Sequence, residues 1–482
     1  MTPTPGFSST LQNIVNAVSG VLTDYVLVGV LLAAAVFFTI ATRGVQFRMV
    51  GEMLRLLVRS GKRDNDKRRN DAPAHGSISS FQAFAMSIAS RVGTGNLAGV
   101  ASAIALGGPG AVFWMWVIAI LGAASAFVES TLAQLFKVKG DKSFMGGPAY
   151  YILKGLHKRW WAVTFAVLIT LTFGFAFNSV QSNTISDALA SSFAVPREAT
   201  AWALCLLTLA VICGGVQRIS RVSEIVVPVM AIAYIVLAAV IIVMNIGRFP
   251  EILMLIVSNA FGADEVLGGT VGAAMVMGIK RGLFSNEAGE GSTPNAAATA
   301  SVSHPVKQGL IQTLGVYTDT LLVCTATAFI ILCSGIFEQG HDGIVLTQHA
   351  IDTGLGGGHN YGSIFVSIAI FFFAFTSIIA NYYYGETNIR FIRDNDFAIK
   401  VYRLLVGAIV YAGAVVSLDL VWGFADITMA LMTLCNLAAI VMLGKYAVRL
   451  LKDYQAQKRA GKDPVYHSST IPEIAGETEC WE

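Results

Sequence analysis

Long apolar runs separated by short polar segments extend along most of the chain. Runs such as 26-VLVGVLLAAAVFFTIAT-42 and 229-VMAIAYIVLAAVIIVMNI-246 contain no charged residue. Each has about the length that a helix needs to cross a hydrocarbon core of roughly 30 Å. The short alternating strands of a membrane β-barrel fit these runs poorly. The sequence therefore predicts an all-α polytopic membrane protein.

The apolar runs predict eleven transmembrane spans, one of which is interrupted. Composition supports this reading, because 55% of the residues are hydrophobic and 13% are charged, against roughly 25% charged residues in a soluble domain. The spans lie near 22–42, 79–106, 110–137, 160–190, 198–214, 222–246, 266–300 (interrupted), 307–335, 361–388, 400–420 and 424–446.

Lysine and arginine are distributed unevenly over the segments between the spans. If the first loop, 43–78, is cytoplasmic, the cytoplasmic segments hold 28 of the 33 Lys and Arg residues. Short cytoplasmic loops carry this excess in helical membrane proteins. The N-terminus is therefore expected outside and the C-terminus in the cytoplasm. The basic residues are then a topology signal that faces membrane lipid rather than nucleic acid. We expect 60–77 to be a solvated loop and the tail from Gln455 to be polar and weakly ordered.

Two spans carry glycine and polar residues at positions where a lipid-facing helix would be continuous. The second span contains 93-GTGN-96, and the seventh contains 278-GIKRG-282. Small residues also serve close helix packing in membranes, which is the alternative reading of either segment alone. With the first span set aside, however, the two segments lie in the first helices of two successive five-span halves. Paired breaks in inverted halves point to the substrate site of a transporter.

A broken helix exposes backbone groups that a substrate can satisfy. The N-terminus of a half-helix offers free N–H groups and partial positive charge to a carboxylate, and freed carbonyls suit a cation. A zwitterionic amino acid together with Na⁺ meets both needs. Charged residues of both signs near breaks and helix ends are expected to pair as gates and braces rather than to bind substrate. They are Arg91, Glu129, Lys280, Arg281, Glu287, Glu290 and Asp319.

Other function classes find little support in the residues. The spans contain no H-E-x-x-H zinc motif, no Ser/His constellation and no nucleotide-binding loop, and all seven histidines fall outside them. The sequence therefore does not predict an enzyme. An ion channel would more often be built from symmetric subunits than from two inverted halves in one chain.

Three long motifs resemble the alanine/glycine:cation symporter family, also called sodium:alanine symporters. They are 91-RVGTGNLAGVASAIALGGPGAVFWMW-116, 147-GPAYYI-152 and 281-RGLFSNEAGEGSTPN-295. The resemblance implies a LeuT-type fold of two inverted five-helix repeats with one extra N-terminal helix. It also implies Na⁺-driven import of small neutral amino acids, such as alanine and glycine, across a bacterial-type inner membrane, with no required protein partner. The corresponding regions are 1–78 (extra helix and basic loop), 79–246 (first repeat), 247–452 (second repeat) and 453–482 (cytoplasmic tail).

The resemblance also implies a substrate site. In LeuT-type carriers, backbone N–H groups at the first break bind the substrate carboxylate, and these map to Thr94 and Gly95, followed by Asn96. Asn178 and Gln181 share one helix face, and the family makes Gln181 a substrate contact. Interhelical hydrogen bonding is the alternative for Asn178 and, more strongly, for Asn183. At the second break, Gly278 and Ile279 would supply a carbonyl for the amino group and an apolar wall.

A sodium site is implied in the same way. It would use the carbonyls of Ala89 and Val92, before the first break, with the adjacent hydroxyls of Thr376 and Ser377. Sodium accepts such neutral oxygen ligands. Back-bonding of the two hydroxyls to their own helix is the alternative.

Asn381 departs from the family pattern as we understand it, which usually has Trp at this place. It lies one helical turn after Ser377 and is expected to border the substrate cavity. An amide in place of an indole predicts a pocket that admits a longer polar side chain. Glutamine or asparagine as main substrate therefore remains an alternative, and coupling to H⁺ is another.

Overall fold

The computed structural model of the protein describes residues 18–70, 78–140, 143–262, 271–357, 360–416 and 418–481. Residues 266–270 of the seventh predicted span and 71–77 of the first loop lie outside them. The α-helices are α2 (Val28–Ala41), α3 (Val45–Arg48), α4 (Val50–Asn70), α5 (Ser80–Arg91), α6 (Val100–Gly107), α7 (Ala111–Leu135), α8 (Pro148–Leu156), α9 (Arg159–Ile169), α10 (Asn178–Phe193), α11 (Arg197–Ile212), α12 (Val216–Met244), α13 (Phe249–Ala260), α14 (Val271–Asn286), α15 (Thr293–Ala298), α16 (Pro305–Val316), α17 (Thr325–Ser334), α18 (Gly343–Gly354), α19 (Tyr361–Ile392), α20 (Asp396–Val415) and α21 (Leu418–Arg459).

Short helical segments of other types and one small hairpin complete the structure. Four π-helical segments continue neighbouring α-helices: η1 (Gly20–Leu27), η2 (Gly95–Gly99), η3 (Thr170–Phe177) and η5 (Tyr317–Cys324). The 3₁₀ turns are η4 (Ile246–Arg248), η6 (Ser468–Thr470) and η7 (Pro472–Glu477). Strands β1 (Val138–Lys139) and β2 (Phe144–Met145) pair antiparallel.

Eight helices of the described chain are long and apolar enough to cross a membrane, and they confirm eight of the predicted spans. Their lengths range from 20 to 39 residues. They are 20–41, 111–135, 159–193, 216–244, 305–334, 361–392, 396–415 and 421–459.

The other three predicted spans correspond to short or divided helices. The second, 79–106, is formed by α5, η2 and α6, with a break after Arg91. The fifth, 198–214, corresponds to α11, which has 16 residues. The seventh, 266–300, contains α14 and the six-residue α15. These three predicted spans therefore differ from the eight continuous ones because their helices are broken or short.

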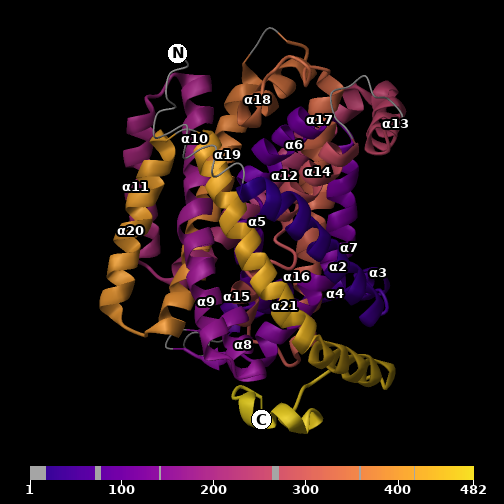
Figure 1. Cartoon of the computed structure of the whole chain (residues 1–482), viewed down its shortest axis with the longest axis vertical. Coiled ribbons are helices and arrows are strands. Elements are labelled where there is room, and N and C mark those ends of the chain that lie inside the picture. Colours follow the sequence, from indigo (N-terminus) through magenta and orange to yellow (C-terminus); the bar gives the residue numbers. More distant parts are fainter. Residues whose placement is uncertain are drawn as a thin grey trace.

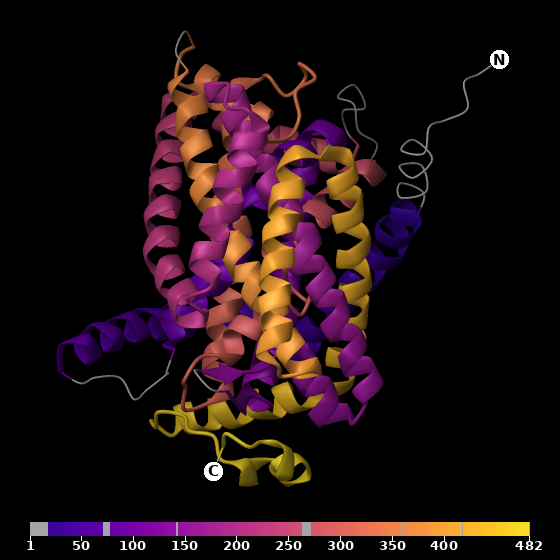
Figure 2. The same ribbon diagram turned by 90° about the vertical axis from the view of Figure 1, so that its left-hand side faces the viewer.

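The helices form one bundle whose long helices run mainly along its vertical axis (Figures 1 and 2). Helix α7 packs against α14, α16 and α2, while α10 packs against α19 and α20. Helix α5 packs against α12 and α19, and α14 packs against α6 as well as α7. The segment after α14 is buried throughout, from Glu287 to Ser292.

The second break lies later in the chain than the sequence analysis predicted. Helix α14 continues without interruption through residues 278–282 and ends at Asn286. A Cβ at Gly278 would lie 2.7 Å from the Cβ of Trp114 and closer still to the carbonyl oxygen of Ala111, both in α7. This glycine therefore serves close helix packing, the alternative noted above. The break follows at residues 287–292, where Glu287, Gly289 and Gly291 have positive φ.

The C-terminal segment corrects a second prediction, because it is folded against the bundle. Helix α21 continues to Arg459, and η6 and η7 follow. Tyr466, Ile471 and Trp481 are buried, and the indole N–H of Trp481 donates to the carbonyl of Gln134 at 3.0 Å. A few large apolar side chains in a mostly polar stretch are enough to hold it.

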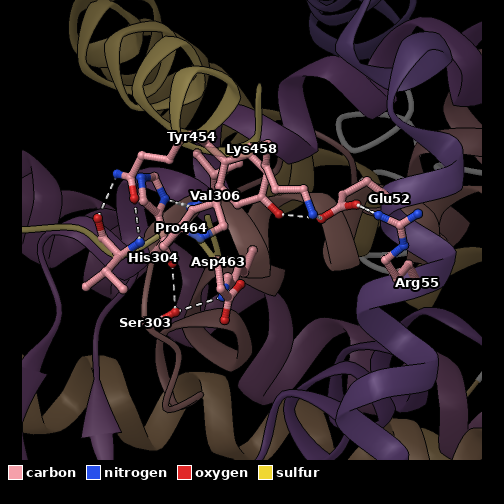
Figure 3. Close-up of polar contacts among 12 residues, drawn as sticks. Glu52, Arg55, Ser303, His304, Val306, Tyr454, Lys458, Asp463 and Pro464 are labelled. Carbon is pink, nitrogen blue, oxygen red and sulfur yellow. Dashed lines mark hydrogen bonds and ion pairs between the residues drawn. The ribbon is translucent and has the colours of Figure 1, made fainter. Parts of the chain in front are cut away.

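Polar contacts fasten the same segment to the end of the bundle (Figure 3). The Tyr454 hydroxyl donates to Glu52 at 2.7 Å, and Lys458 pairs with the same carboxylate at 2.9 Å. Farther along, Asp463 pairs with Lys307 at 2.7 Å. The Glu52 contacts join the C-terminal helix to α4. We predicted a loop at residues 60–77. The structure describes this stretch up to Asn70, and that part is the end of helix α4. The prediction of a loop was therefore wrong for these residues.

His304 lies in the centre of these contacts and begins α16. Its Nε2 is 3.1 Å from Asp453 Oδ2, and burial lowers the pKa of His304 to about 4 although Asp453 opposes this. A neutral imidazole accepts at Nδ1, and there it takes the N–H of Val306. His304 therefore caps α16 in its uncharged form.

Candidate functional site

The first break is held open by two amide side chains. Helix α5 starts with a capping box formed by Ser79 and Gln82, and Val92 leaves the helical conformation with φ −81° and ψ 93°. The N–H of Gly93 then donates to Asn96 Oδ1 at 3.0 Å. The N–H of Thr94 donates to Gln181 Oε1 at 2.9 Å, and the Thr94 hydroxyl donates to the same oxygen at 2.8 Å.

The oxygen of Gln181 therefore occupies a position suited to a carboxylate oxygen. Both are sp² oxygens that accept from N–H and O–H donors. The predicted substrate residues Thr94 and Gln181 are brought together, and they are buried. A carboxylate that took over these two donors would make charge-assisted hydrogen bonds.

Oxygen atoms also converge where the sodium site was predicted. The Ser377 hydroxyl lies 2.7 Å from the carbonyl oxygen of Ala89 and 3.5 Å from that of Val92. The Thr376 hydroxyl donates only to the carbonyl of Phe373 in its own helix, at 2.9 Å, which is the alternative considered for this pair. The Ser377 hydroxyl also lies 3.0 Å from that carbonyl. Three of the four predicted ligands thus meet, and their neutral oxygens fit Na⁺ better than a softer metal.

Gly93 lies between the two groups of ligands. A Cβ at this position would be 2.7 Å from Gln181 Oε1 and closer still to Ser377 Oγ. The absence of a side chain therefore lets the hydroxyl of α19 and the amide of α10 approach the same backbone segment. By contrast, a Cβ at Gly95 would meet Phe284 and the Cα of Ser285, each at 3.1 Å. Gly95 thus serves the contact with α14.

Asp319 joins the first break to α14. Its carboxylate accepts from Asn96 Nδ2 at 2.7 Å, from the Ser285 hydroxyl at 2.8 Å and from the Thr320 hydroxyl at 2.8 Å. It lies in η5, a π-helical stretch of a transmembrane helix, a feature often found at functional sites. The sequence placed Asp319 only among gates and braces.

The second break is organised by Glu129 of α7. Its two carboxylate oxygens accept the N–H groups of Gly289 at 3.2 Å and Gly291 at 3.0 Å. Asn436 of α21 donates to the same carboxylate at 2.9 Å, and also to the carbonyl of Gly289 at 2.9 Å. One buried carboxylate therefore satisfies backbone donors that lipid cannot satisfy.

Ser90 connects the two breaks, and the sequence analysis did not select it. Its Oγ lies 2.6 Å from Glu287 Oε1 and 2.8 Å from Asn381 Oδ1. A hydroxyl has one proton, so Ser90 donates to one of these acceptors at a time. The amide nitrogen of Asn381 has no partner among the described residues. Ser90 follows Ala89, a predicted sodium ligand, directly in the sequence, and this position was the signal that could have identified it.

Several predicted site residues do not join this cluster. Asn178 donates to Gly174 in its own helix at 3.2 Å. Asn183 donates to Gly413 and Val416, which is the interhelical bonding considered for it. Gly278 faces α7, and Ile279 is buried within continuous α14. The predicted roles of Gly278 and Ile279 rested on a break that frees a backbone carbonyl at these positions. Helix α14 has no break there.

Lys280 and Arg281 form ion pairs, as expected of braces. Lys280 lies 2.9 Å from Asp24 and 3.4 Å from Asp426. Arg281 pairs with Asp426 at 3.2 Å and lies over the Trp422 ring at 4.2 Å. These contacts join α14 to η1 and α21.

A cavity of about 410 Å³ lies beside these braces and is lined in part by Ala98, Thr184 and Trp422. This volume is in the range of small-molecule sites. Trp422 packs on Phe284 at 4.7 Å between ring centroids, and Phe284 is the residue that faces Gly95. Phe284 therefore lies close both to a residue that lines the cavity and to the first break.

Known proteins match this chain over almost its whole length. The model of the sodium:alanine symporter family matches residues 8–468. The probable sodium/glutamine symporter GlnT of Bacillus subtilis (strain 168) is 50% identical over 472 residues, covering 98% of this chain and 96% of the relative. The amino-acid carrier protein AlsT of the same organism is 48% identical over 475 residues, covering 98% and 99%.

Solved structures support the fold. The crystal structure of MhsT in complex with L-phenylalanine matches with a TM-score of 0.52 at 13% identity, covering 84% of this chain and 93% of that one. At this identity the likeness concerns the fold alone, which is of the LeuT type. With symporters and carriers as its relatives, the chain is a multi-pass membrane transporter rather than an enzyme, and it belongs to the sodium:alanine symporter family.

Proposed function

We propose that this protein is a sodium-coupled symporter that imports small neutral amino acids, with alanine and glycine as first candidates, by alternating access. The observation that carries this proposal is the meeting of two ligand sets at one broken helix. Ser377 reaches the carbonyls of Ala89 and Val92, and Gln181 reaches the donors of Thr94. Gly93 lies between them.

The membrane arrangement is part of the proposal. The eight continuous spans and the three short or divided helices make eleven crossings in two inverted five-helix repeats after an N-terminal helix. The N-terminus is outside and the C-terminus in the cytoplasm, as the positive residues indicate.

In this mechanism, Na⁺ lies against the Ala89 and Val92 carbonyls and the Ser377 hydroxyl. Thr376 completes the site when its hydroxyl turns away from Phe373. The substrate carboxylate displaces the Gln181 oxygen from Thr94. A potential of about 150 mV contributes roughly 3.5 kcal/mol per Na⁺, and a tenfold Na⁺ gradient adds about 1.4 kcal/mol. Together these sustain roughly a thousandfold accumulation or more.

Replacement of Ser377 by alanine tests the ion site. Ser377→Ala is expected to raise the Na⁺ concentration for half-maximal uptake by about tenfold, a loss of roughly 1.4 kcal/mol. Thr376→Ala, on the adjacent residue of the same helix, is the matched variant and is expected to have a smaller effect, because the Thr376 hydroxyl donates to its own helix whereas that of Ser377 also reaches Ala89 and Val92. Uptake into proteoliposomes, with K⁺ replacing Na⁺ at fixed pH, measures both. A variant that carries both substitutions and keeps the sodium dependence of the wild type would refute the assignment of Thr376 and Ser377 to the sodium site.

Glutamine is the second candidate substrate. The Asn381 amide nitrogen is buried and has no partner within the described structure, and such a donor suits the amide oxygen of a substrate side chain. A site built to bond an amide discriminates strongly against analogues that lack it. The 50% identical relative that is named a probable sodium/glutamine symporter supports the same candidate.

A competition panel distinguishes the two substrates. Unlabelled glutamine, asparagine, alanine and glycine compete with labelled substrate in the wild type and in Asn381→Trp. If glutamine is the substrate, Asn381→Trp is expected to weaken glutamine competition by about tenfold or more relative to alanine. Asn183→Ala is the matched amide control, since Asn183 bonds carbonyls between helices. If the wild type ignores glutamine and asparagine, alanine or glycine remains the substrate.

A further inference from the structure

Glu290, in the second break, has a fully buried carboxyl group without a hydrogen-bond partner. Its exposed fraction is 0%, and neither carboxyl oxygen has a partner among the described residues. The other two acids of the region differ. Glu129 accepts from Gly289, Gly291 and Asn436, and Glu287 accepts from Ser90 and Ser292.

No basic side chain neutralises Glu290 directly. Arg91 is the nearby cation, but its guanidinium donates to neutral oxygens, the carbonyl of Gln312 at 3.1 Å and the hydroxyl of Thr293 at 3.2 Å. Within the described chain, no ion pair within 4 Å includes Glu290. Arg91 attracts the Glu290 charge from a longer distance, whereas Glu129 and Glu287 repel it.

The titratable groups around Glu290 come from several packed elements. They carry two carboxyl groups and one guanidinium, so an ionised Glu290 would add to an excess of negative charge. Helix α16 faces Arg91 with the uncharged backbone carbonyl of Gln312. The charged groups are Glu287 of the same segment, Glu129 of α7 and Arg91 of α5. Tyr384 of α19 interacts with Glu287, and Tyr151 of α8 interacts with Glu129.

An ionised carboxylate in such surroundings is strongly unfavourable, because burial removes its hydration and no donor replaces it. The neutral acid needs no counter-ion. A metal cation would need several oxygen ligands, and no group of three or more acidic, His or Cys side chains in the described residues is placed to hold one. The chemistry of the position therefore favours a proton.

We propose that Glu290 is a proton-binding site of the transport cycle, protonated in the arrangement seen here and exchanging its proton with water when the second break opens. The O–H bond of the carboxyl group breaks, the proton passes to water, and a carboxylate remains beside Arg91. The inference rests on the proposed transport function. Discontinuous helices line the transport route of carriers, and Glu290 is in the segment that interrupts one.

Infrared spectroscopy of the purified full-length protein tests the protonation directly. The wild type is expected to show a carboxylic C=O band at neutral pH, and Glu290→Gln, which keeps the shape of the neutral acid, is expected to lose it. Glu198→Gln, an exposed acid at the start of α11, is the control and keeps the band. A wild type without the band, or a Glu290→Gln variant whose band keeps the full wild-type intensity, shows that Glu290 is ionised and overturns the proposal.

Proton exchange is tested separately. Addition of Na⁺ with L-alanine or L-glutamine to the wild type in weakly buffered detergent solution is expected to change the signal of a pH-sensitive dye, and Glu290→Gln is expected to abolish that change. The pH dependence of uptake across the neutral range should be lost with it. If the band is lost but the dye signal and pH profile persist, the proton is static and the proposal fails.

The titration of the infrared band in the wild type alone gives a further test, should Glu290→Gln fail to fold. A band that Na⁺ and substrate leave unchanged at every pH contradicts exchange. The infrared and dye readouts do not require transport. A failure of the proposed function, seen as wild-type uptake that ignores Na⁺, is therefore distinguishable from a failure of the Glu290 assignment.

Discussion

Replacement of Gly93 by alanine is expected to reduce amino acid uptake by about a hundredfold or more, which corresponds to roughly 2.7 kcal/mol. The added methyl group would lie 2.7 Å from Gln181 Oε1 and closer to Ser377 Oγ. Gln181 can move its amide, but Ser377 is short and fully buried. The methyl group would therefore separate the sodium ligands of α19 from the break and occupy space between ion and substrate. Uptake per molecule of carrier at the membrane measures the effect.

Gly99→Ala provides the matched control in the same broken helix. A Cβ at Gly99 has the carbonyl of Thr94, at 3.8 Å, as its nearest neighbour, an ordinary contact. Because alanine also favours a helix over glycine, this variant is expected to transport normally. If Gly93→Ala and Gly99→Ala have equal uptake, the space at Gly93 does not matter and the proposed joint site is wrong.

The sequence was informative where one physical requirement determined the pattern. Continuous spans must be long and apolar, and eight were confirmed. The break at 93–96 was also predictable, because polar residues and glycines interrupt an apolar run there. The hydroxyl and carbonyls predicted to hold sodium do lie together, since Ser377 meets the carbonyls of Ala89 and Val92; that they bind sodium stays a prediction. The sequence could not decide whether the Thr376 hydroxyl turns toward the site or toward its own helix, because the carbonyls of that helix are competing acceptors.

The second break shows what local pattern leaves undetermined. Gly278 and Gly282 are as small as the glycines of a break, yet both meet side chains of α7, Trp114 and Ile118 respectively, and the helix continues. The actual break depends on Glu129, which is more than 150 residues away in sequence and supplies acceptors for two N–H groups. Such a partnership is a tertiary contact. The C-terminal tail was missed for a similar reason, because Trp481 is held by Gln134 of α7.

Glu129→Ala is expected to destabilise the protein by about 3 to 5 kcal/mol, as removal of one member of a buried charged network does. The N–H groups of Gly289 and Gly291 would lose their acceptor, as would one N–H of Asn436. Each buried donor left unsatisfied costs about 1 to 3 kcal/mol. The melting temperature in detergent should fall by roughly 5 °C or more.

Two further variants separate the hydrogen bonds from the charge. Glu129→Gln keeps the shape and one acceptor oxygen, so it is expected to recover part of the stability that Glu129→Ala loses. Glu198→Ala, at an exposed site, should have the same melting temperature as the wild type. Thermal unfolding followed by tryptophan fluorescence compares all three. A Glu129→Ala variant as stable as the wild type would mean that water replaces the carboxylate at Gly289 and Gly291. The second break would then be a hydrated loop that α7 does not hold in place. Conformational exchange of this loop would not require its hydrogen bonds to Glu129 to break.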